Sequence, residues 1–258
     1  MRITCIERVL IATPSTAESR RQWARAGFAI APNEHELKGV RFTGLAAGAI
    51  EVDLCEPTGG DAAPLAATVA EAASRGGGII GWTWGVAPGE PRPNLPIQLP
   101  GVEASALAQG LTGVFTGVLE VTAGENVRCH LHRETFGNNP NTVEFLEHIV
   151  VMAPALDDAI ATHEALGIPC KRIREVGNGT RQAFFKLKRT VIEVVGPARD
   201  RAGGWGLAFM CSDIARAVAL VRENGLAATE PRKAIQGGLI ARAVDPIDGV
   251  SIAFMQAP

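Results

Sequence analysis

The chain has 258 residues and a formal net charge of −2, with 47% hydrophobic and 20% charged residues. This length and composition are typical of a folded protein with a large core, arranged as one large domain or two of ordinary size. Because the charge is slightly negative and no dense stripe of Lys and Arg appears, we expect neither nucleic acid nor a membrane surface as a partner.

Motifs that mark several other protein classes are missing from the sequence. The N-terminal apolar run is short and contains Glu7 and Arg8, which suits a strand better than a secretory signal. No uncharged apolar stretch approaches the roughly 20 residues that a membrane-spanning helix needs. There is no glycine-rich dinucleotide motif and no Walker loop. We therefore expect a cytoplasmic protein that uses no nucleotide cofactor.

The first part of the chain predicts two units of strands and helices. The first unit is expected to contain a strand at 8–13, a helix at 17–26 that Gly27 ends, and strands at 39–45 and 49–55. A connecting helix at 64–77 follows. The second unit is expected to contain a strand at 78–86, a Pro-rich interruption at 88–100, a short helix at 102–110 and a strand at 113–121.

A polar segment at 124–141 then separates two halves of the chain. The third unit is expected to contain a strand at 147–153, a helix at 156–166 and strands at 181–187 and 190–195. The fourth is expected to contain a strand at 205–211, a helix ending near 223, and strands at 238–244 and 249–255. His163 is expected on an exposed helix face, and Asp248 in a turn.

The third unit repeats the first. Residues 6–28 and 146–168 share one apolar pattern, and Arg8 stands as far before Gly27 as His148 before Gly167. Each unit also contains a later Ile-Glu-Val, with Glu51 in one and Glu193 in the other. The duplication predicts two similar halves, 1–136 and 137–258.

Four such units in tandem resemble the vicinal oxygen chelate superfamily, which includes glyoxalase I, methylmalonyl-CoA epimerase, extradiol dioxygenases and bleomycin-resistance proteins. The resemblance is clearest in residues 3–57 and 143–256, where LEHIVV, TVIEVVGP and AVDPIDGVSIAFM are similar to the superfamily's patterns. It implies an α+β glyoxalase-like fold, in which tandem βαβββ modules form two cupped mixed sheets. The second module would be a modified copy.

The resemblance also implies a metal site in the C-terminal half. In the superfamily, side chains from the first and last strands of a unit converge on a divalent metal, and the matching positions here are His148 and Glu193. Imidazole and carboxylate ligands suit Fe, Mn, Ni, Co or Zn. The paired unit has Gly206 and Ala253 at the corresponding positions. His130 or His132, on a preceding hairpin, would therefore have to complete the site.

Each of these residues also has a simpler interpretation. His148 is alternatively a hydrogen-bonded core residue, and the histidines of 130-HLH-132 alternatively belong to an exposed polar hairpin. Glu193 is alternatively solvent-facing on a half-exposed strand. As a further functional alternative, Glu193 serves as a general base whose pKa the surrounding apolar strand raises.

Other residues are candidates for substrate binding. Arg8 stands where the superfamily would place a histidine, and we expect it to pair with Glu51 because a guanidinium has no lone pair to offer a metal. The N-terminal cup is then metal-free, with a ligand anion as an additional partner of the pair. Arg133 suits a substrate carboxylate. Trp82 and Trp205 lie in strands where they would line a pocket or pack in the core.

Two hypotheses for function follow from the resemblance. The first is an enzyme of isomerase, lyase or dioxygenase type that acts on a small oxygenated metabolite, with a divalent metal polarising the substrate oxygens. The second is a metal-free protein that binds a small molecule, as the bleomycin-resistance members do, and the missing ligands in the fourth unit favour it. Both require a small-molecule partner. A homodimer is a further option, because such units pair within one chain or between chains.

Overall fold

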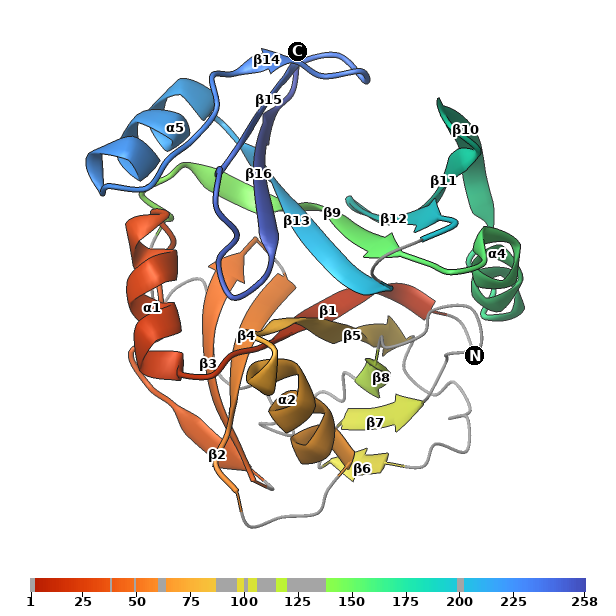
Figure 1. Ribbon diagram of the computed structural model, residues 1–258, viewed down its shortest axis with the longest axis horizontal. Coiled ribbons are helices and arrows are strands. Elements are labelled where there is room, and N and C mark those ends of the chain that lie inside the picture. The colour runs from red at the N-terminus through yellow and green to blue at the C-terminus, as the bar shows by residue number, and fades with distance from the viewer. Residues whose placement is uncertain are drawn as a thin grey trace.

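The structure is a computed structural model that describes residues 3–37, 39–48, 50–59, 64–86, 97–99, 102–105, 115–119, 138–198 and 202–258. Within these residues the chain forms two mixed sheets of eight strands each and four helices (Figure 1). The helices are α1 (Thr16–Arg25), α2 (Pro64–Ser74), α4 (Leu156–Ala165) and α5 (Ile214–Glu223). Across the described residues, no helix has the length and apolar character that crossing a membrane requires.

Each sheet is built from one half of the sequence. The first contains β1 (Ile3–Ala12), β2 (His35–Leu37), β3 (Val40–Ala47), β4 (Ile50–Pro57), β5 (Gly78–Val86), β6 (Ile97–Leu99), β7 (Val102–Ser105) and β8 (Phe115–Leu119). The second contains β9 (Val143–Met152), β10 (Cys170–Gly177), β11 (Thr180–Leu187), β12 (Thr190–Gly196), β13 (Gly203–Cys211), β14 (Arg232–Lys233), β15 (Leu239–Arg242) and β16 (Ser251–Gln256).

The two sheets have the same topology. Their strand orders are β2-β3-β4-β1-β5-β8-β7-β6 and β10-β11-β12-β9-β13-β16-β15-β14. In the first, β1 runs parallel to β4 and antiparallel to β5; in the second, β9 runs parallel to β12 and antiparallel to β13. The α+β class and the duplicated mixed sheets predicted from the sequence are thereby confirmed.

Local signals at the helix ends account for the repeated spacing in the sequence. The side chains of Ser15 and Asp213 each accept a hydrogen bond from a backbone N–H in the first turn of α1 and α5. Gly27, Gly167 and Gly225 follow α1, α4 and α5 with φ angles of +83°, +77° and +75°. Glycine reaches this left-handed conformation without steric cost, so each helix ends where the sequence predicted.

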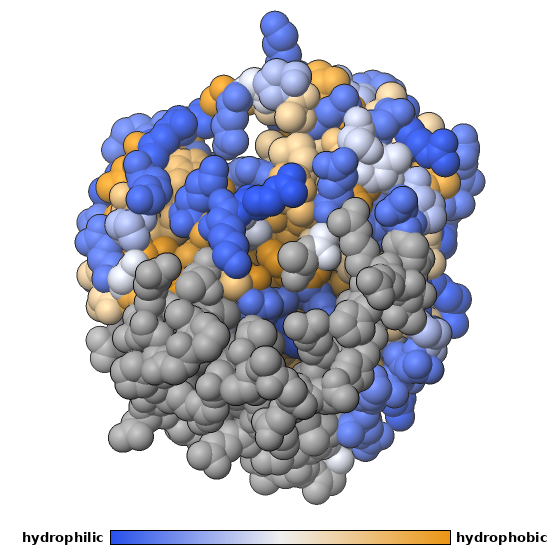
Figure 2. All heavy atoms as spheres, turned by 180° about the vertical axis from the view of Figure 1, so that it is seen from behind, coloured by the Kyte–Doolittle hydropathy of each residue, from blue (hydrophilic) through white to orange (hydrophobic). Residues whose placement is uncertain are grey.

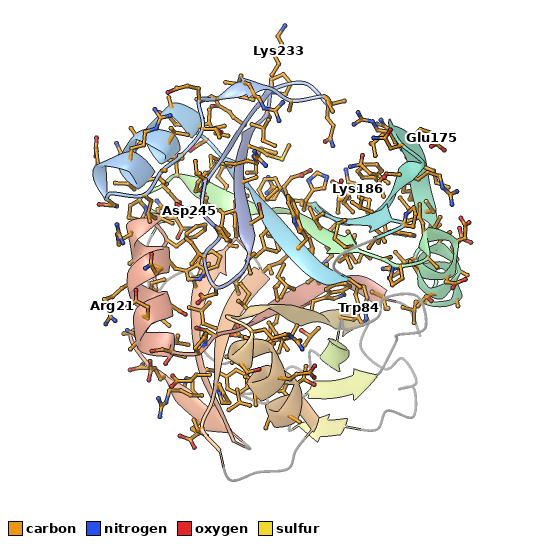
Figure 3. All side chains as sticks on the ribbon, viewed as in Figure 1. Arg21, Trp84, Glu175, Lys186, Lys233 and Asp245 are labelled. Atoms are coloured by element: carbon orange, nitrogen blue, oxygen red, sulfur yellow. The ribbon has the colours of Figure 1, made fainter. Side chains whose placement is uncertain are left out.

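The main core lies between the two sheets and draws on both halves. Phe28, just after α1, packs edge-on against Phe209 of β13 with ring centroids 4.8 Å apart. Trp84 of β5 lies at the boundary between the sheets (Figure 3), where its ring approaches His163 of α4. A Cβ on Gly204 would lie 2.4 Å from the Cβ of Ile79, so β13 and β5 pass too closely for any larger side chain. The halves therefore pack as one unit.

Asp248 connects the last turn of the chain to α1. Its Oδ1 accepts hydrogen bonds from the hydroxyls of Thr13 (3.0 Å) and Ser19 (2.6 Å), and its Oδ2 accepts one from the indole N–H of Trp23 (2.9 Å). Asp248 has a φ of +49°, as expected of a residue in a tight turn. The sequence predicted the turn, but the contacts across the molecule come from the tertiary structure.

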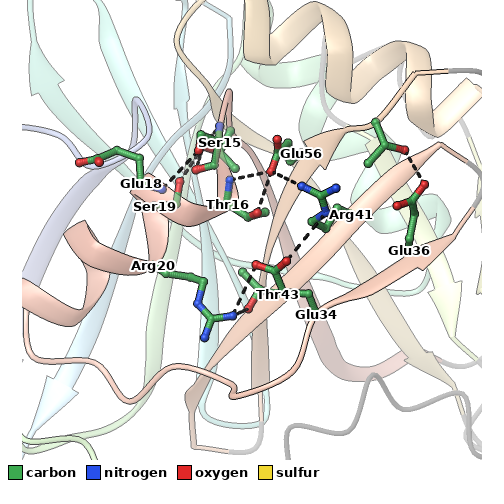
Figure 4. A network of polar contacts seen from close by, with 12 residues as sticks. Ser15, Thr16, Glu18, Ser19, Arg20, Glu34, Glu36, Arg41, Thr43 and Glu56 are labelled. Carbon is green, nitrogen blue, oxygen red and sulfur yellow. Dashed lines mark hydrogen bonds and ion pairs between the residues drawn. The ribbon is translucent and has the colours of Figure 1, made fainter.

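A polar network attaches the start of α1 to the first sheet (Figure 4). The carboxylate of Glu56 accepts hydrogen bonds from the backbone N–H (2.9 Å) and the hydroxyl (2.7 Å) of Thr16. Arg41 of β3 lies 3.3 Å from the same carboxylate oxygen. A negative charge beside the first turn of a helix is favourable, because the unpaired N–H groups there carry partial positive charge.

Helix α2 fills the concave face of the first sheet. A second, smaller apolar cluster joins residues of α2, among them Leu65 and Val69, to Leu10, Phe42 and Ile80 of the sheet. Helix α2 contacts β4, β5, β1 and β3, and in Figure 1 it lies below β1 and β5. The concave face of this sheet is therefore occupied by the protein itself.

Some sequence-based expectations were wrong. The helix expected at 102–110 begins instead as strand β7, whose pairing with β6 and β8 overrides the local preference of an Ala-containing segment for helix. Strands β2, β6, β10 and β14 were not predicted. His163 is buried, not exposed, and stacks on Phe185 with ring centroids 4.2 Å apart. The boundary near residue 137 stays a prediction, because residues 120–137 are outside the described ranges.

Candidate functional site

The concave face of the second sheet encloses a cavity of about 500 Å³. This volume lies in the range of small-molecule sites. Most of the lining is apolar, and the polar groups are few. In the upper half of Figure 2, apolar side chains are visible between hydrophilic ones that surround them. The lining includes His148, Val150, Arg174, Gln182, Glu193, Trp205, Gly206, Arg232, Ile240, Arg242, Ala253 and Met255.

Strand alternation brings His148 and Glu193 to this cavity. Along β9, His148 and Val150 face the cavity while Ile149 faces the main core. The parallel strand β12 pairs Glu193 with Val150, so Glu193 projects from the same face of the sheet. Two residues that are far apart in the sequence thus lie on adjacent strands and line one cavity.

The imidazole of His148 is buried, with 4% of the residue exposed. Burial lowers the pKa of His148 to about 4, because a charged imidazolium would lose its hydration, so the ring is neutral at pH 7. A β-bulge where β9 meets β13 allows the neighbouring Glu147 carboxylate to contact Nδ1 of His148.

The carboxyl group of Glu193 is held by one side chain and influenced by another. The Gln182 side-chain amide donates a hydrogen bond of 2.6 Å to Oε1 of Glu193. Burial raises the pKa of Glu193, and the positive charge of Arg174 opposes this by favouring the carboxylate. A carboxyl group with a raised pKa in an apolar cavity is suited to accept and return a proton near neutral pH.

The two predicted tryptophans occupy different environments. Trp205 of β13 is 39% exposed and lines the cavity. Trp82 does not line this cavity: it is fully buried in the main core beside Trp84, with ring centroids 5.5 Å apart. A bulge at Ile80 and Gly81 reverses the alternation of β5 and turns Trp82 toward the core. Core packing, the alternative interpretation, describes Trp82.

Arg8 and Glu51 form the expected ion pair on the first sheet, with 2.6 Å between Nη2 and Oε2. Arg8 also lies 2.8 Å from Oδ2 of Asp53, which the sequence analysis did not single out. The pairing register shows why. Asp53 pairs with Leu10 as Glu193 pairs with Val150, so Asp53, not Glu51, occupies the position equivalent to Glu193. The shared Ile-Glu-Val motif had aligned the two strands two residues out of step.

The described residues supply only part of a metal site. His148 and Glu193 both line the cavity, but the strands opposite contribute Gly206 and Ala253, which have no donor side chain. No group of three or more His, Cys, Asp or Glu residues that could hold a metal occurs in the described ranges. His130, His132 and Arg133 lie outside these ranges. The metal stays a prediction, and no chemical step is assigned to it here.

Three arginines that the sequence did not point to also line the cavity. Arg174 belongs to β10, Arg232 to β14 and Arg242 to β15. Two of these strands were not predicted, because their short or charged sequences lack a clear alternating pattern. The only available signal was the alternation of Ile240 and Arg242 along β15, which places both on one face.

No protein-family model matches the sequence, and no curated protein matches it either. Among solved structures, the chain is similar over 99% of its length to a "xylose isomerase-like TIM barrel/4-hydroxyphenylpyruvate dioxygenase fusion protein" (TM-score 0.69, 15% identity). The chain spans about half of that protein, 49%. It is equally similar to a mutant of 4-hydroxymandelate synthase from Streptomyces coelicolor, of which it covers 93% (99% of this chain, TM-score 0.69, 14% identity).

A methylmalonyl-CoA epimerase from Mycobacterium tuberculosis matches 45% of the chain and 90% of its own length, with 23% identity and a TM-score of 0.39. These solved structures belong to the vicinal oxygen chelate superfamily. The similarity to the first two structures extends over 99% of this chain. Together with the duplicated sheets, it shows that the chain has the glyoxalase-like fold of this superfamily.

Proposed function

We propose that the cavity of the second sheet is the active site of a glyoxalase-like enzyme that acts on a small oxygenated metabolite. The observation that carries this proposal is the position of Glu193, whose carboxyl group lines an apolar cavity beside a neutral histidine and has a pKa raised by burial. Groups with perturbed pKa values in a concave pocket are the usual participants in proton transfer.

The chemistry that these residues support is proton transfer next to a carbonyl group. Ionised Glu193 would accept a proton from the carbon beside the carbonyl, and the electron pair of the broken C–H bond would form an enolate. Arg174, whose charge already acts on Glu193, would stabilise that negative charge. The neutral imidazole of His148, which lines the same cavity, would form a hydrogen bond with a substrate hydroxyl. Returning the proton to a different atom or face gives an isomerase, and expelling a leaving group gives a lyase.

Gln182 has a positioning role in this scheme. Its amide N–H holds Oε1 of Glu193, while no described residue donates a hydrogen bond to Oε2. The second oxygen is therefore the one that can face a substrate. A dioxygenase reaction would additionally require a redox-active metal, which His148 and Glu193 could hold only with a further donor.

Solvent deuterium exchange into a panel of small 2-oxo acids and hydroxyketones, followed by proton NMR, tests the proposal. For compounds that the protein exchanges, Glu193→Gln should lower the rate by about 10²–10⁴-fold, because the amide cannot accept the proton. Glu175→Gln, on the exposed strand β10, is the matched control and should leave the rate unchanged. Exchange that persists in Glu193→Gln, or no exchange with any compound, would contradict the assignment.

A second candidate function is non-catalytic binding of a small molecule. Gly206 and Ala253, opposite His148 and Glu193, favour it because they leave the cavity with few reactive groups. Metal analysis of protein purified without chelators separates the hypotheses further. Near-stoichiometric metal that is lost in both His148→Ala and Glu193→Gln would support the metal-dependent enzyme, whereas ligand binding without exchange would support sequestration.

A further inference from the structure

The rim of the cavity carries a concentration of positive charge that the proposed proton transfer does not use. Arg232 of β14 and Arg242 of β15 line the same cavity as Glu193 of β12. In the order of strands, β14 and β15 lie at one end of the sheet and β12 lies toward the other end. Neither guanidinium group has a hydrogen bond or an ion pair with any residue that the structure describes. Both are exposed and can reach a ligand at the cavity entrance.

The register of the edge strands directs these two side chains inward. Arg232 pairs with Ile240, which pairs in turn with Met255, and Arg242 pairs with Ala253. Residues that pair directly across antiparallel strands share one face, and all five line the cavity. The side chain of Lys233, the next residue along the strand, points away from the molecule (Figure 3).

The charges around the cavity are strongly unbalanced. With Arg174, three arginines line it, and Glu193 is the acidic residue among the lining side chains. The floor between these groups is apolar. Guanidinium groups bind carboxylate and phosphate oxygens through paired N–H donors, and such contacts strengthen where water is partly excluded.

We propose that Arg232 and Arg242 form a binding site for the anionic group of an amphipathic organic acid, whose apolar body occupies the cavity floor. This inference rests on the proposed function in naming the kind of substrate that reaches Glu193. The recognised chemistry is an oxyanion, a carboxylate or a phosphate, at the β14–β15 edge. The reacting carbon then lies toward β12, where Glu193 and His148 are located.

Calorimetric binding of matched probes tests the site without any turnover. The probes are 3-phenylpropionate and octanoate, each compared with its neutral amide, and 2-phenylethyl phosphate as the phosphate form. At least one anion should bind about 10-fold or more tightly than its neutral partner. Tighter binding of the phosphate than of 3-phenylpropionate would identify the phosphate class, and the reverse would identify the carboxylate class.

Variants test whether the preference for anions depends on Arg232 and Arg242. The double variant Arg232→Gln/Arg242→Gln should bind the anion and its amide equally, while Lys233→Gln, which removes the same charge from the same strand, should keep the preference. Circular dichroism would check that the double variant is folded. The single variant Arg232→Gln, for which a partial loss of the preference is expected, gives a second measurement. Equal binding of anions and amides by the unmodified protein, or no binding of any probe, would overturn the proposal.

The outcomes separate this inference from the proposed function. A charge preference without deuterium exchange would retain the arginine site and remove the catalytic assignment. Exchange that depends on Glu193, without a charge preference, would do the reverse. Glu193→Gln should keep the preference for anions, because the arginines are unchanged and a negative charge in the cavity is removed.

Discussion

The two concave faces of this molecule have the same strand order and opposite contents. The first is covered by α2, and its buried arginine is neutralised by the carboxylates of Glu51 and Asp53. The second encloses a cavity of about 500 Å³ with a neutral histidine, a carboxyl group of raised pKa and arginines at its rim. The fold alone therefore does not make a binding site; the segments that cover or leave open each face decide it.

The comparison also explains why similar positions serve different purposes. Arg8 occupies in the first sheet the position that His148 occupies in the second. A buried guanidinium cannot lose its proton and must keep its acidic partners, whereas an imidazole becomes neutral at little cost. The first face is accordingly stabilised by fixed charge, and the second keeps groups that can exchange protons.

The largest expected effect is on the first face. Arg8→Ala removes the cation that contacts buried Asp53 and partly buried Glu51, and we expect a loss of about 3–5 kcal/mol in the free energy of unfolding, measured by urea denaturation. Arg242→Ala, on the second face, should change stability by about 0.5 kcal/mol or less, because this side chain is exposed. Equal losses in the two variants would contradict the assignment of structural charge to the first face only.

Substitutions of one apolar residue on each concave face compare how tightly the two faces are packed. Leu65 of α2 is buried with 2% of the residue exposed, and Leu65→Ala should cost about 2–5 kcal/mol of unfolding free energy. Met152 lines the open cavity and is only partly buried, so Met152→Ala should cost about 1 kcal/mol or less. Thermal and urea denaturation of both variants measure this difference. A small loss for Leu65→Ala would mean that α2 is not firmly packed on the sheet.

The smallest effect concerns pH. Because burial lowers the pKa of His148 to about 4, the unfolded chain takes up a proton below about pH 6.5 while the folded protein does not. Stability therefore falls as the pH drops from about 6.5 toward 4, and this histidine contributes a loss of about 2 kcal/mol at pH 5. Between pH 7 and pH 5, the unfolding free energy of His148→Asn should fall by about 2 kcal/mol less than that of the unmodified protein. The same loss in both proteins would show that His148 is not buried in the neutral form.

Several features of the fold could be predicted because they depend on local patterns. The helices α1, α4 and α5 were predicted close to their observed bounds, since a glycine follows each of them and polar caps begin α1 and α5. The sequence left Trp82 open between the pocket and the core, and it placed His163 wrongly on the surface. A bulge in β5 and the packing of α4 on β11 decide where these side chains lie, and neither is visible in a local pattern.

The candidate site was predictable only in part. His148 and Glu193 were identified because each lies in a strand of clear alternation and matches a position in the superfamily's pattern, although the repeat aligned Glu193 with Glu51 two residues out of step. Asp53 was missed because motif alignment does not fix the register between strands, which depends on pairing over the whole sheet. Arg174 and Arg232 were missed because β10 and β14 lack a strong apolar pattern and owe their structure to the strands beside them. Arg242 lies in a strand that was predicted, but its side-chain direction depends on the pairing of β15 with β16.

The sequence by itself determined the duplication, the α+β class, the helix ends and the presence of an imidazole and a carboxylate on two strands of the third unit. Those features depend on short-range periodicity, which the order of residues encodes directly. The tertiary structure decided that α2 covers one concave face, that the other remains open, and that edge-strand arginines surround it. Such features depend on which surfaces bury most apolar area against each other, a property of contacts between distant segments.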